Sequence, residues 1–372
     1  MRVNSKKIIQ KLEQQFPKSL ADSWDNVGFQ IGNEDSAVDV ILTCLEVTDA
    51  VIDEAVEKCA GLIIAHHPLI FKAPKTLSEH DPKAHLMTRL IKENIGLYVM
   101  HTNFDHGTGG LSDLMASELK LSRTVHLKEV HSEKLVKIIV YIPTDHVDAV
   151  ETAVFEAGAG HIGKYSNCGF KSSGLGSYQA TEGANPFIGE IGKLAVTEEV
   201  KLETIVQAAN LSHVIEAMIK AHPYEEVAYD LIPLMNKGMT ESLGRVGYLD
   251  EPMSPTEFAQ HVKNCYGLET LKMSVPRDKK IYKVAVISGA GMDFIADVAH
   301  TRADAFVTGD VRYHETMESR HFGIAIADVG HFESEVVFSK GVKAILDRMI
   351  DEQGYDLRVE ASSAEKPIFE FY

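Results

Sequence analysis

The chain has 372 residues, which corresponds to two or three domains at roughly 150 residues per domain. Hydrophobic residues make up 45% and charged residues 24%, a composition that excludes collagen, coiled coil and intrinsic disorder. The formal charge of -17, from 37 Lys and Arg against 54 Asp and Glu, repels phosphate backbones and anionic lipids. We therefore expect no direct nucleic-acid partner and no membrane partner.

The N-terminal segment predicts a surface helix rather than a signal peptide. Charges are spread along it, and apolar side chains recur at helical spacing at Ile8, Ile9, Leu12 and Phe16. No apolar run approaches the roughly 20 residues that span a bilayer. The four cysteines are scattered without a CxxC pair, and a chain of this size needs no disulfides. These features predict a cytoplasmic protein.

Strands and helices alternate in the N-terminal third of the chain. Short apolar runs that end in polar or glycine residues predict buried strands, and a helical pattern follows each of them. This order is typical of βαβ units on a parallel sheet. The predicted strands are Val38–Val47, Gly61–Ala65 and Gly96–Met100, and the predicted helices are Asp49–Cys59 and one that includes His85–Glu93.

The middle of the chain breaks this alternation. Two β-α-β passages with extra strands between them predict a ferredoxin-like α+β domain at 130–236, inserted into a core of 1–129 and 237–372. We expect Thr144 to cap the first helix of the insert and Asn236–Glu241 to be a linker. The predicted elements are strand Lys134–Pro143, helix Thr144–Ala157, hairpins in Gly158–Gly192, strand Lys201–Gln207, helix Leu211–Lys220 and strand Glu226–Ile232.

The alternation returns near the C-terminus. Three further apolar runs predict strands at Lys283–Ser288, Ala305–Thr308 and Gly323–Asp328, with helices at Met292–Ala299 and Tyr313–Arg320 between them. The fold class is therefore α/β. Two βαβαβ halves, far apart in sequence, predict a pseudo-symmetric pair.

Histidines and carboxylates follow four of the predicted strands. In open parallel sheets, ligands bind beyond the carboxyl ends of the strands. Both halves of the chain contribute, so we expect a site where these strand ends meet, with Glu333 directed away from it at the surface. The residues are His66 and His67, then His101, Asn103, Asp105 and His106, then Asp310 and His314, and finally His331, Glu333 and Glu335.

Neutral imidazole with carboxylate is a ligand set for zinc, iron, manganese or nickel rather than for calcium or magnesium. His331 and Glu335 are four residues apart, so within a helix they share one face. His66 and His67 are neighbours that point apart at a strand end, so two metals could take one each, bridged by a carboxylate. We predict a dinuclear site, zinc first, with metals roughly 3.5–4 Å apart. Its ligands are His66, His67, Asp105, His331 and Glu335.

Each of these features has a simpler explanation when it is taken alone. Adjacent histidines arise by chance in a chain with 17 of them. Asp105 and Glu335 could each be a helix cap or a solvated carboxylate. The convergence of all of them on strand ends favours the metal site.

Five separated motifs resemble those of the NIF-three-like family, which is also catalogued as GTP cyclohydrolase I type 2. They occur in the family's order and span both halves of the chain. The motifs are WDNVG (Trp24–Gly28), IIAHHPLIF (Ile63–Phe71), HTNFD (His101–Asp105), TGDVRYHE (Thr308–Glu315) and GHFESE (Gly330–Glu335). The resemblance implies two metals on the five ligands named above, an α/β core with pseudo-two-fold halves, and a toroidal homohexamer.

The resemblance also bears on the middle of the chain. Longer members of the family carry an inserted module similar to CutA and PII proteins. HPYEEVAYDL (His222–Leu231) looks like the CutA strand signature, so the predicted insert resembles the long form of the family. We expect a structural role for His222 and Glu225 rather than metal binding.

The family name implies hydrolytic opening of the imidazole ring of GTP. A divalent metal would activate water, and a nearby histidine would transfer a proton to the ring nitrogen. His101 and His314 are candidates for that transfer or for orienting a metal-bound imidazole, and we favour the orienting role for Asp310. The sequence has no phosphate-binding glycine loop, so a nucleotide would depend on metals, on helix N-termini and on cations such as Arg245 or Arg312.

Two other functions stay open. One is a different two-metal hydrolase that acts on a small phosphoester or amide substrate. The other is a non-catalytic, hexameric regulatory or scaffold protein whose metals are structural. Five ligands are too few to fill two coordination shells, which favours open positions and therefore catalysis. Direct DNA binding is disfavoured, because the charge is negative and no helix-turn-helix or zinc-finger pattern occurs.

Overall fold

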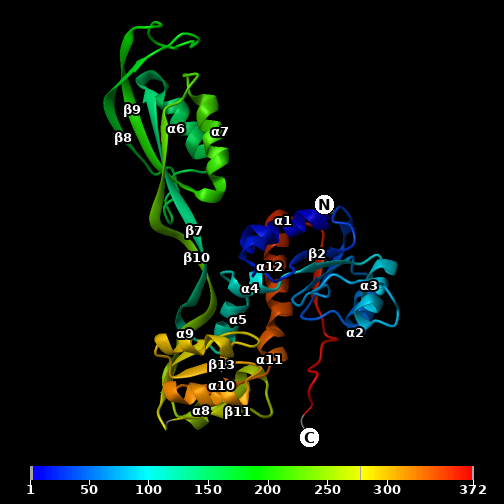
Figure 1. Cartoon of the computed structure of the whole chain (residues 1–372). Helices are drawn as coiled ribbons and strands as arrows, with labels where there is room; N and C mark the ends of the chain where they lie inside the picture. The colour runs from blue at the N-terminus through cyan, green and yellow to red at the C-terminus, as the bar shows by residue number, and fades with distance from the viewer. Residues whose placement is uncertain (1–2, 277, 371–372) are drawn as a thin grey trace. The chain divides into compact units, whose positions relative to one another are not determined.

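The computed structural model describes residues 3–276 and 278–370. They form two compact units, one within Met1–His131 and Glu241–Tyr372 and the other formed by Ser132–Thr240, both drawn in Figure 1. The first unit is discontinuous in sequence, because the chain leaves it for the second unit and then returns. The predicted mixed α/β architecture is confirmed, with several separate sheets.

One sheet of the first unit has five strands in the order β15-β4-β5-β6-β2. Its central strands β4, β5 and β6 pair in parallel and are buried along their whole length. Helices α1 and α12 cover one face and α2 and α3 the other, which explains the nearly continuous apolar runs. The bounds are α1 Ser5–Gln15, β2 Gly28–Ile31, β4 Val40–Cys44, α2 Asp49–Glu57, β5 Leu62–Ala65, α3 Pro82–Lys92, β6 Gly96–Val99, α12 Val337–Gln353 and β15 Arg358–Ala361.

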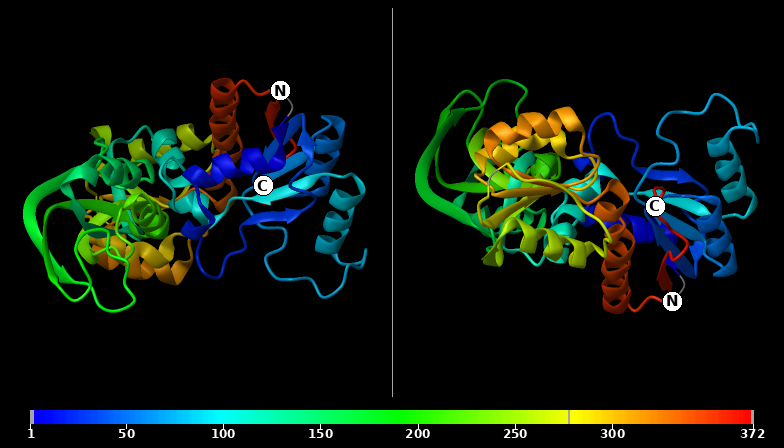
Figure 2. Two further views of the ribbon diagram at one scale, coloured as in Figure 1. Left: turned by 90° about the horizontal axis from the view of Figure 1, so that it is seen from above. Right: turned by 90° about the horizontal axis from the view of Figure 1, so that it is seen from below.

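The far end of the chain completes this sheet. Strand β15 pairs in parallel with β4, and α12 packs on the same sheet through Phe338, Val342 and Leu346. Both views in Figure 2 show α12 and β15, in orange to red, beside the blue N-terminal elements. The sequence patterns do not predict this contribution, because β15 has four residues and its one buried apolar side chain is Val359.

A second set of parallel strands in the first unit is part of an eight-stranded sheet. Strands β12, β13 and β14 pair in parallel in chain order, with β10 antiparallel beside β12 and β11 antiparallel beside β14. The bounds are α5 Leu111–Glu118, β10 Tyr229–Met253, α8 Pro255–Tyr266, β11 Lys272–Ser274, β12 Ile281–Val286, α9 Ile295–His300, β13 Ala305–Thr308, α10 Tyr313–Ser319 and β14 Ala325–Asp328. Shorter elements are β1 Val3–Asn4, paired with β3 Ala37–Val38, and the 3-10 turns η1 Lys18–Leu20, η4 Met292–Phe294 and η5 Arg320–Phe322.

The second unit has the element order β-α-β-β-α-β, with its strands arranged β10-β7-β9-β8. This is the element order of the split βαβ motif. Helices α6 and α7 pack on one face of the sheet around Val150, Val154, Val214 and Met218. The bounds are β7 Ser122–Pro143, η2 Thr144–His146, α6 Val147–Glu156, β8 Gly169–Gln179, β9 Leu194–Gln207, η3 Ala208–Asn210 and α7 Leu211–Ala221.

Two predictions for the middle of the chain are wrong. Thr144 does not cap a helix: it begins the 3-10 turn η2, α6 begins at Val147, and the Thr144 hydroxyl donates to the Glu198 carbonyl at 3.5 Å. The predicted linker Asn236–Glu241 lies within the continuous strand β10. Gly238 lies so close to Glu133 that an added Cβ would be 2.7 Å from the Glu133 Cβ. Its glycine therefore allows a close approach between strands rather than a flexible connection.

None of the helices among residues 3–276 and 278–370 combines the length and the apolar character that a bilayer span requires.

A buried carboxylate fastens the C-terminal segment of the chain to α2. Glu54 accepts hydrogen bonds from the hydroxyls of Ser362 (2.6 Å) and Ser363 (2.8 Å), and the Lys58 ammonium lies 2.9 Å away. Burial alone would raise the pKa of Glu54, but the hydrogen bonds of Ser362, Lys58 and Ser363 outweigh it and lower this pKa to about 2. Folding therefore favours the charged form.

We expect Glu54→Gln to lower the free energy of unfolding by about 2 kcal/mol at neutral pH, because a charged acceptor of several hydrogen bonds is lost. The stabilisation by wild-type Glu54 is complete above its unfolded pKa of 4.5 and is lost as the pH falls through about 2. Urea denaturation across this pH range measures both effects. Glu57→Gln, at an exposed position of the same helix, is the control. An equal loss in both variants would contradict the assignment.

Candidate metal centre

Side chains that follow strands β5, β6 and β14 meet in the first unit. His66 and His67 come directly after β5, and His101 lies two residues beyond β6. Asp105 is in the short helix α4, Thr102–His106, whereas His331 and Glu335 begin and end α11, His331–Glu335. Potential ligand atoms of His66, His67 and His101 all lie within 4.8 Å of one another, and so do those of His67, His331 and Glu335. His67 is common to both groups.

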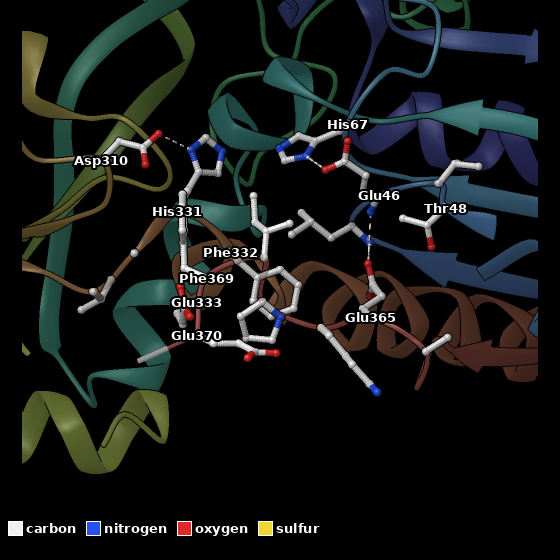
Figure 3. Close-up of a pocket in the computed structure, with 18 of the residues that line it drawn as sticks. Glu46, Thr48, His67, Asp310, His331, Phe332, Glu333, Glu365, Phe369 and Glu370 are labelled. Atoms are coloured by element: carbon white, nitrogen blue, oxygen red, sulfur yellow. Dashed lines mark hydrogen bonds and ion pairs between the residues drawn. The ribbon is translucent and has the colours of Figure 1, made fainter. Parts of the chain in front are cut away.

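The Glu335 carboxylate joins the two histidines that come from opposite halves. His67 Nε2 donates to Glu335 Oε2 at 2.9 Å, and His331 Nε2 lies 3.0 Å from the same oxygen. Behind them, His67 Nδ1 lies 3.3 Å from Glu46 Oε2 and His331 Nδ1 lies 2.8 Å from Asp310 Oδ2 (Figure 3). Each imidazole is thus held between an outer and an inner carboxylate. Outer carboxylates of this kind fix the orientation of metal-binding imidazoles.

These contacts determine the charges of the cluster without a cation. Burial lowers the pKa of His67, but its hydrogen bonds to Glu335 and Glu46 raise that pKa to about 10. The hydrogen bond to Glu335 is the main reason that the pKa of His331 rises to about 9. Burial would raise the pKa of Glu335, but His331 and His67 hold it well below its usual range. At neutral pH two imidazolium ions therefore flank one buried carboxylate, and each is also paired with an outer carboxylate.

His66 differs from both. Its Nδ1 donates to the Met100 carbonyl at 2.8 Å, so Nε2 carries a lone pair. This Nε2 is fully buried, has no hydrogen-bond partner among the described residues, and lies 3.7 Å from Asp105 Oδ1. Burial lowers the pKa of His66 to about 3, so the ring is neutral at physiological pH. Burial and the charge of Glu335 raise the pKa of Asp105 to about 7. An unpaired lone pair beside a destabilised carboxylate fits a divalent cation.

A fully buried carboxylate orients His101. His101 Nδ1 donates to Asp25 Oδ1 at 2.9 Å, and Asp25 Oδ2 accepts from the Thr102 amide (3.1 Å) and hydroxyl (2.6 Å). Burial would raise the pKa of Asp25, but His101 and Thr102 lower it to about 2. The arrangement directs His101 toward His66 and His67, whose ring centroids lie 5.1 and 5.6 Å away. Asp25 is not among the residues expected at the site from the sequence, although it lies in the WDNVG motif.

The turn after β12 lies against the same cluster. Gly289 has a φ of +55°, and an added Cβ would lie 2.5 Å from Glu335 Oε1 and 3.2 Å from the His331 ring. Its amide donates to Ser334 Oγ at 3.0 Å, and Ser288 Oγ donates to Asp105 Oδ1 at 3.4 Å. Glycine is therefore needed for close approach to the ligands, not for a phosphate.

Other residues singled out in the sequence lie outside the cluster. His314 is exposed on α10, its ring contacts Tyr313 at 5.4 Å, and it belongs to neither of the two ligand groups found among the described residues. Arg245 is buried, and its guanidinium binds both carboxylate oxygens of Asp113 at 2.6 and 2.8 Å. Arg245 is thus a structural residue rather than a surface cation. Arg312 is exposed, 3.4 Å from Glu315.

A cavity of about 1660 Å³ opens beside His67 and His331 (Figure 3). Phe332, Ile368 and Phe369 are among its apolar lining residues. Carboxylates outnumber lysines around it, and one of the lysines, Lys272, is paired with Asp328 at 2.7 Å. The acidic residues are Glu46, Asp49, Glu79, Asp310, Asp328, Glu333, Glu365 and Glu370, and the lysines are Lys272 and Lys366. Such a lining disfavours a polyanionic ligand.

We expect Gly289→Ala to lower the free energy of unfolding by about 3 kcal/mol, because the methyl group both strains a positive φ and collides with Glu335. Gly267→Ala is the matched control: its φ is +67° and no atom lies within 4 Å of the added Cβ, so about 1 kcal/mol is expected. Denaturant unfolding of both variants measures the difference. Equal losses would mean that the turn does not press on the ligands.

Comparison with known proteins identifies the family. The model of Duf34/NIF3 (NGG1p interacting factor 3) matches residues 3–367. Proteins of Halalkalibacterium halodurans and Bacillus subtilis, both named GTP cyclohydrolase 1 type 2 homolog, are 42% and 40% identical over 368 and 369 residues, which is 99% of each chain. A crystal structure of a Bacillus cereus protein related to NIF3 has a TM-score of 0.89 at 39% identity, and covers 100% of this chain and 99% of that one. The chain therefore belongs to the Duf34/NIF3 family.

Proposed function

We propose that the chain is a hydrolase with a dinuclear metal centre, of the kind that the name GTP cyclohydrolase 1 type 2 homolog describes. One observation carries the proposal: the neutral, buried His66 keeps an unpaired lone pair 3.7 Å from the Asp105 carboxylate. An unsatisfied buried polar atom costs about 1–3 kcal/mol. A divalent cation would satisfy the imidazole and the carboxylate together.

Six side chains would hold the two ions. They are the five ligands expected from the sequence together with His101, whose ligand atom lies within 4.8 Å of those of His66 and His67. Zinc is the first expectation, because it accepts imidazole and carboxylate ligands, with Fe²⁺, Mn²⁺ or Ni²⁺ as alternatives. Six donors leave coordination positions of two ions open to water and substrate. Open positions favour an enzyme over a scaffold with structural metals.

The chemistry follows from the way in which these ligands are held. Divalent ions at the site would lower the pKa of a bound water molecule to about 7 and polarise the bond under attack. Glu46 and Asp310 hold the Nδ1 protons of His67 and His331, which turns both Nε2 atoms toward Glu335. Asp25 does the same for His101. The outer carboxylates thus fix tautomer and direction in advance, so the site reorganises little when the ions bind.

The lining of the cavity supports a second candidate substrate. GTP carries a triphosphate, and the eight carboxylates beside His67 and His331 face only two lysines. This electrostatic environment favours an uncharged amide or cyclic amide over GTP and over phosphoesters. GTP and an uncharged amide would both react by hydrolysis of a carbon–nitrogen bond. They differ in the charge of the substrate, so guanosine and GTP form an informative pair.

We expect wild type, loaded at mildly alkaline pH, to bind about two divalent ions per chain and to hydrolyse at least one compound in a panel of nucleotides, nucleosides, phosphoesters and amides. Alkaline loading is chosen because His67 and His331, with pKa values of about 10 and 9, must lose protons to bind metal. The His66→Ala, Glu335→Ala double variant should lose both properties.

The control for the double variant is His314→Ala, which changes an exposed histidine outside both ligand groups. It should keep its metal, and a fall in its turnover would give His314 the proton-transfer role considered from the sequence. Metal content is measured by elemental analysis, with circular dichroism to verify folding. Turnover that survives in the folded double variant would refute metal hydrolysis at this site.

We expect His101→Ala to lose about half of the bound metal, because His101 would be a ligand of one ion only. If His101 transfers protons without binding metal, the variant keeps both ions and loses turnover alone. Asp25→Asn, which removes the charge that orients His101, should weaken metal binding less than His101→Ala. Full metal content and full turnover in His101→Ala would exclude both roles.

The second unit supports a further part of the proposal. We propose that it is the CutA/PII-like insert of long family members, because its six elements have the split βαβ order and HPYEEVAYDL runs from the end of α7 into the start of β10. His222 fits a structural role: Nε2 donates to the Tyr141 carbonyl at 3.0 Å, and Nδ1 accepts from the Tyr224 amide at 3.1 Å. The domain limits 130–236, the hexameric ring and the cytoplasmic location stay predictions.

A further inference from the structure

An exposed pair of aromatic side chains borders the metal-ligand cluster. Trp24 is 58% exposed and Phe71 is 39% exposed. Their ring centroids lie 5.9 Å apart at 50°, and Trp24 also meets the ring of His101 edge to face at 6.1 Å. Other aromatic side chains are also exposed, among them Phe170 and Tyr313, but Trp24 and Phe71 contact each other, and Trp24 also contacts a histidine of the candidate metal centre. We name Trp24 and Phe71 the aromatic pair.

The loops that carry the aromatic pair are fastened on both sides. Asp25, next to Trp24, is hydrogen-bonded to His101 and Thr102 within the cluster. Asn26 donates through Nδ2 to the Ile70 carbonyl, which joins the Trp24 loop to the Phe71 loop. Gln30 strengthens this link: its Nε2 donates to the Asn26 carbonyl at 2.8 Å, and its Oε1 accepts from the Ile70 amide at 2.9 Å.

The consequence is a preformed apolar surface. The hydrogen bonds of Asp25 and Asn26 fix the backbone on the C-terminal side of Trp24. This part of the loop therefore cannot fold over the indole, and the indole remains exposed. Preorganised aromatic rings bind planar rings by stacking, with little loss of conformational entropy. The rigid link from Trp24 through Asp25 to His101 sets the stacking surface at a fixed place beside the candidate metal ligands.

We propose that the aromatic pair binds the planar ring of a substrate that is a nitrogen heterocycle, by stacking on its face. The inference rests on the proposed function, because it takes the metal-ligand cluster as the reaction centre. Stacking on Trp24 would hold the ring by its face and leave its edge, with the carbon–nitrogen bond, directed toward the cluster. Trp24 and Phe71 are thus residues that determine specificity and do not transfer protons.

Trp24 is the only tryptophan of the chain, so intrinsic fluorescence reports on this position alone. We expect guanosine, added to the full-length metal-loaded protein, to quench this fluorescence saturably, whereas ribose leaves it unchanged. Tetramethylammonium serves as a second probe, because cations also bind tryptophan faces. Quenching by tetramethylammonium but not by guanosine would overturn the proposal in favour of a cation site.

Calorimetric titration with guanosine extends the test to variants without tryptophan. Trp24→Leu and Phe71→Leu should each weaken binding about tenfold, whereas Trp24→Phe and Phe71→Tyr should retain most of it. Phe322→Leu, which removes an exposed aromatic ring elsewhere in the first unit, should have no effect. If a heterocyclic compound proves to be a substrate, Trp24→Leu should raise its KM more than it lowers its kcat. The reason is that stacking stabilises the ground state and the transition state equally.

The outcomes separate this inference from the proposed function. In one outcome the protein hydrolyses a compound, but guanosine neither quenches the fluorescence of Trp24 nor binds less tightly to Trp24→Leu. Ring binding by the aromatic pair is then overturned, and the proposed hydrolase function is kept. If guanosine binds at Trp24 but no panel compound is hydrolysed, the proposed function fails and the binding site remains. If Trp24→Leu lowers the sedimentation coefficient without changing guanosine binding, the aromatic pair is a contact between copies of the chain, and the proposal is overturned.

Discussion

The burial of Glu335 is the constraint on which the first unit depends. A carboxylate that is 4% exposed is costly to ionise unless opposite charges and hydrogen bonds compensate. His331, one helical turn away, supplies part of this compensation, and His67, at the end of a strand in the other sheet, supplies the rest. The interaction therefore works only when both sheets are formed and correctly joined. A metal pair would replace the imidazolium protons in the same positions, so the electrostatic problem and the proposed chemistry share one set of residues.

Much of the fold follows from patterns that are visible in the sequence. Strands such as Leu62–Ala65 and Ala305–Thr308 are buried on both faces, so their apolar runs are unbroken, and histidines or acids follow the end of each run. Strand β15 and the attachment of α12 to the N-terminal sheet could not be predicted, because one buried valine in four residues has no periodicity. The wrong linker has a related cause: glycine in Asn236–Glu241 suggests flexibility by composition, but Gly238 serves close strand packing, which is a tertiary property.

The site divides in the same way between local and tertiary causes. The histidines and acids that follow strands can be found from the sequence, because they stand directly after an apolar run. The carboxylates that hold these histidines do not: Asp25 lies 76 residues from His101, and Glu46 lies 21 from His67. No periodicity or spacing in the sequence links either acid to its histidine. Asp25 had one sequence signal, its place in the WDNVG motif, whereas Glu46 had none.

The outer carboxylates and the aromatic pair together describe how the site is held and what it can accept. Glu46, Asp310 and Asp25 each fix one imidazole, and each also adds negative charge around the cluster. Two divalent ions would offset that charge near the ligands but not across the whole cavity, where carboxylates still exceed lysines. Trp24 and Phe71 offer uncharged surface beside His101, and neither of them is among the residues that line this cavity. In the proposed enzyme the electrostatic lining would disfavour negative charge on the ligand, and the aromatic rings would favour a planar ring, although the two features are built from different parts of the sequence.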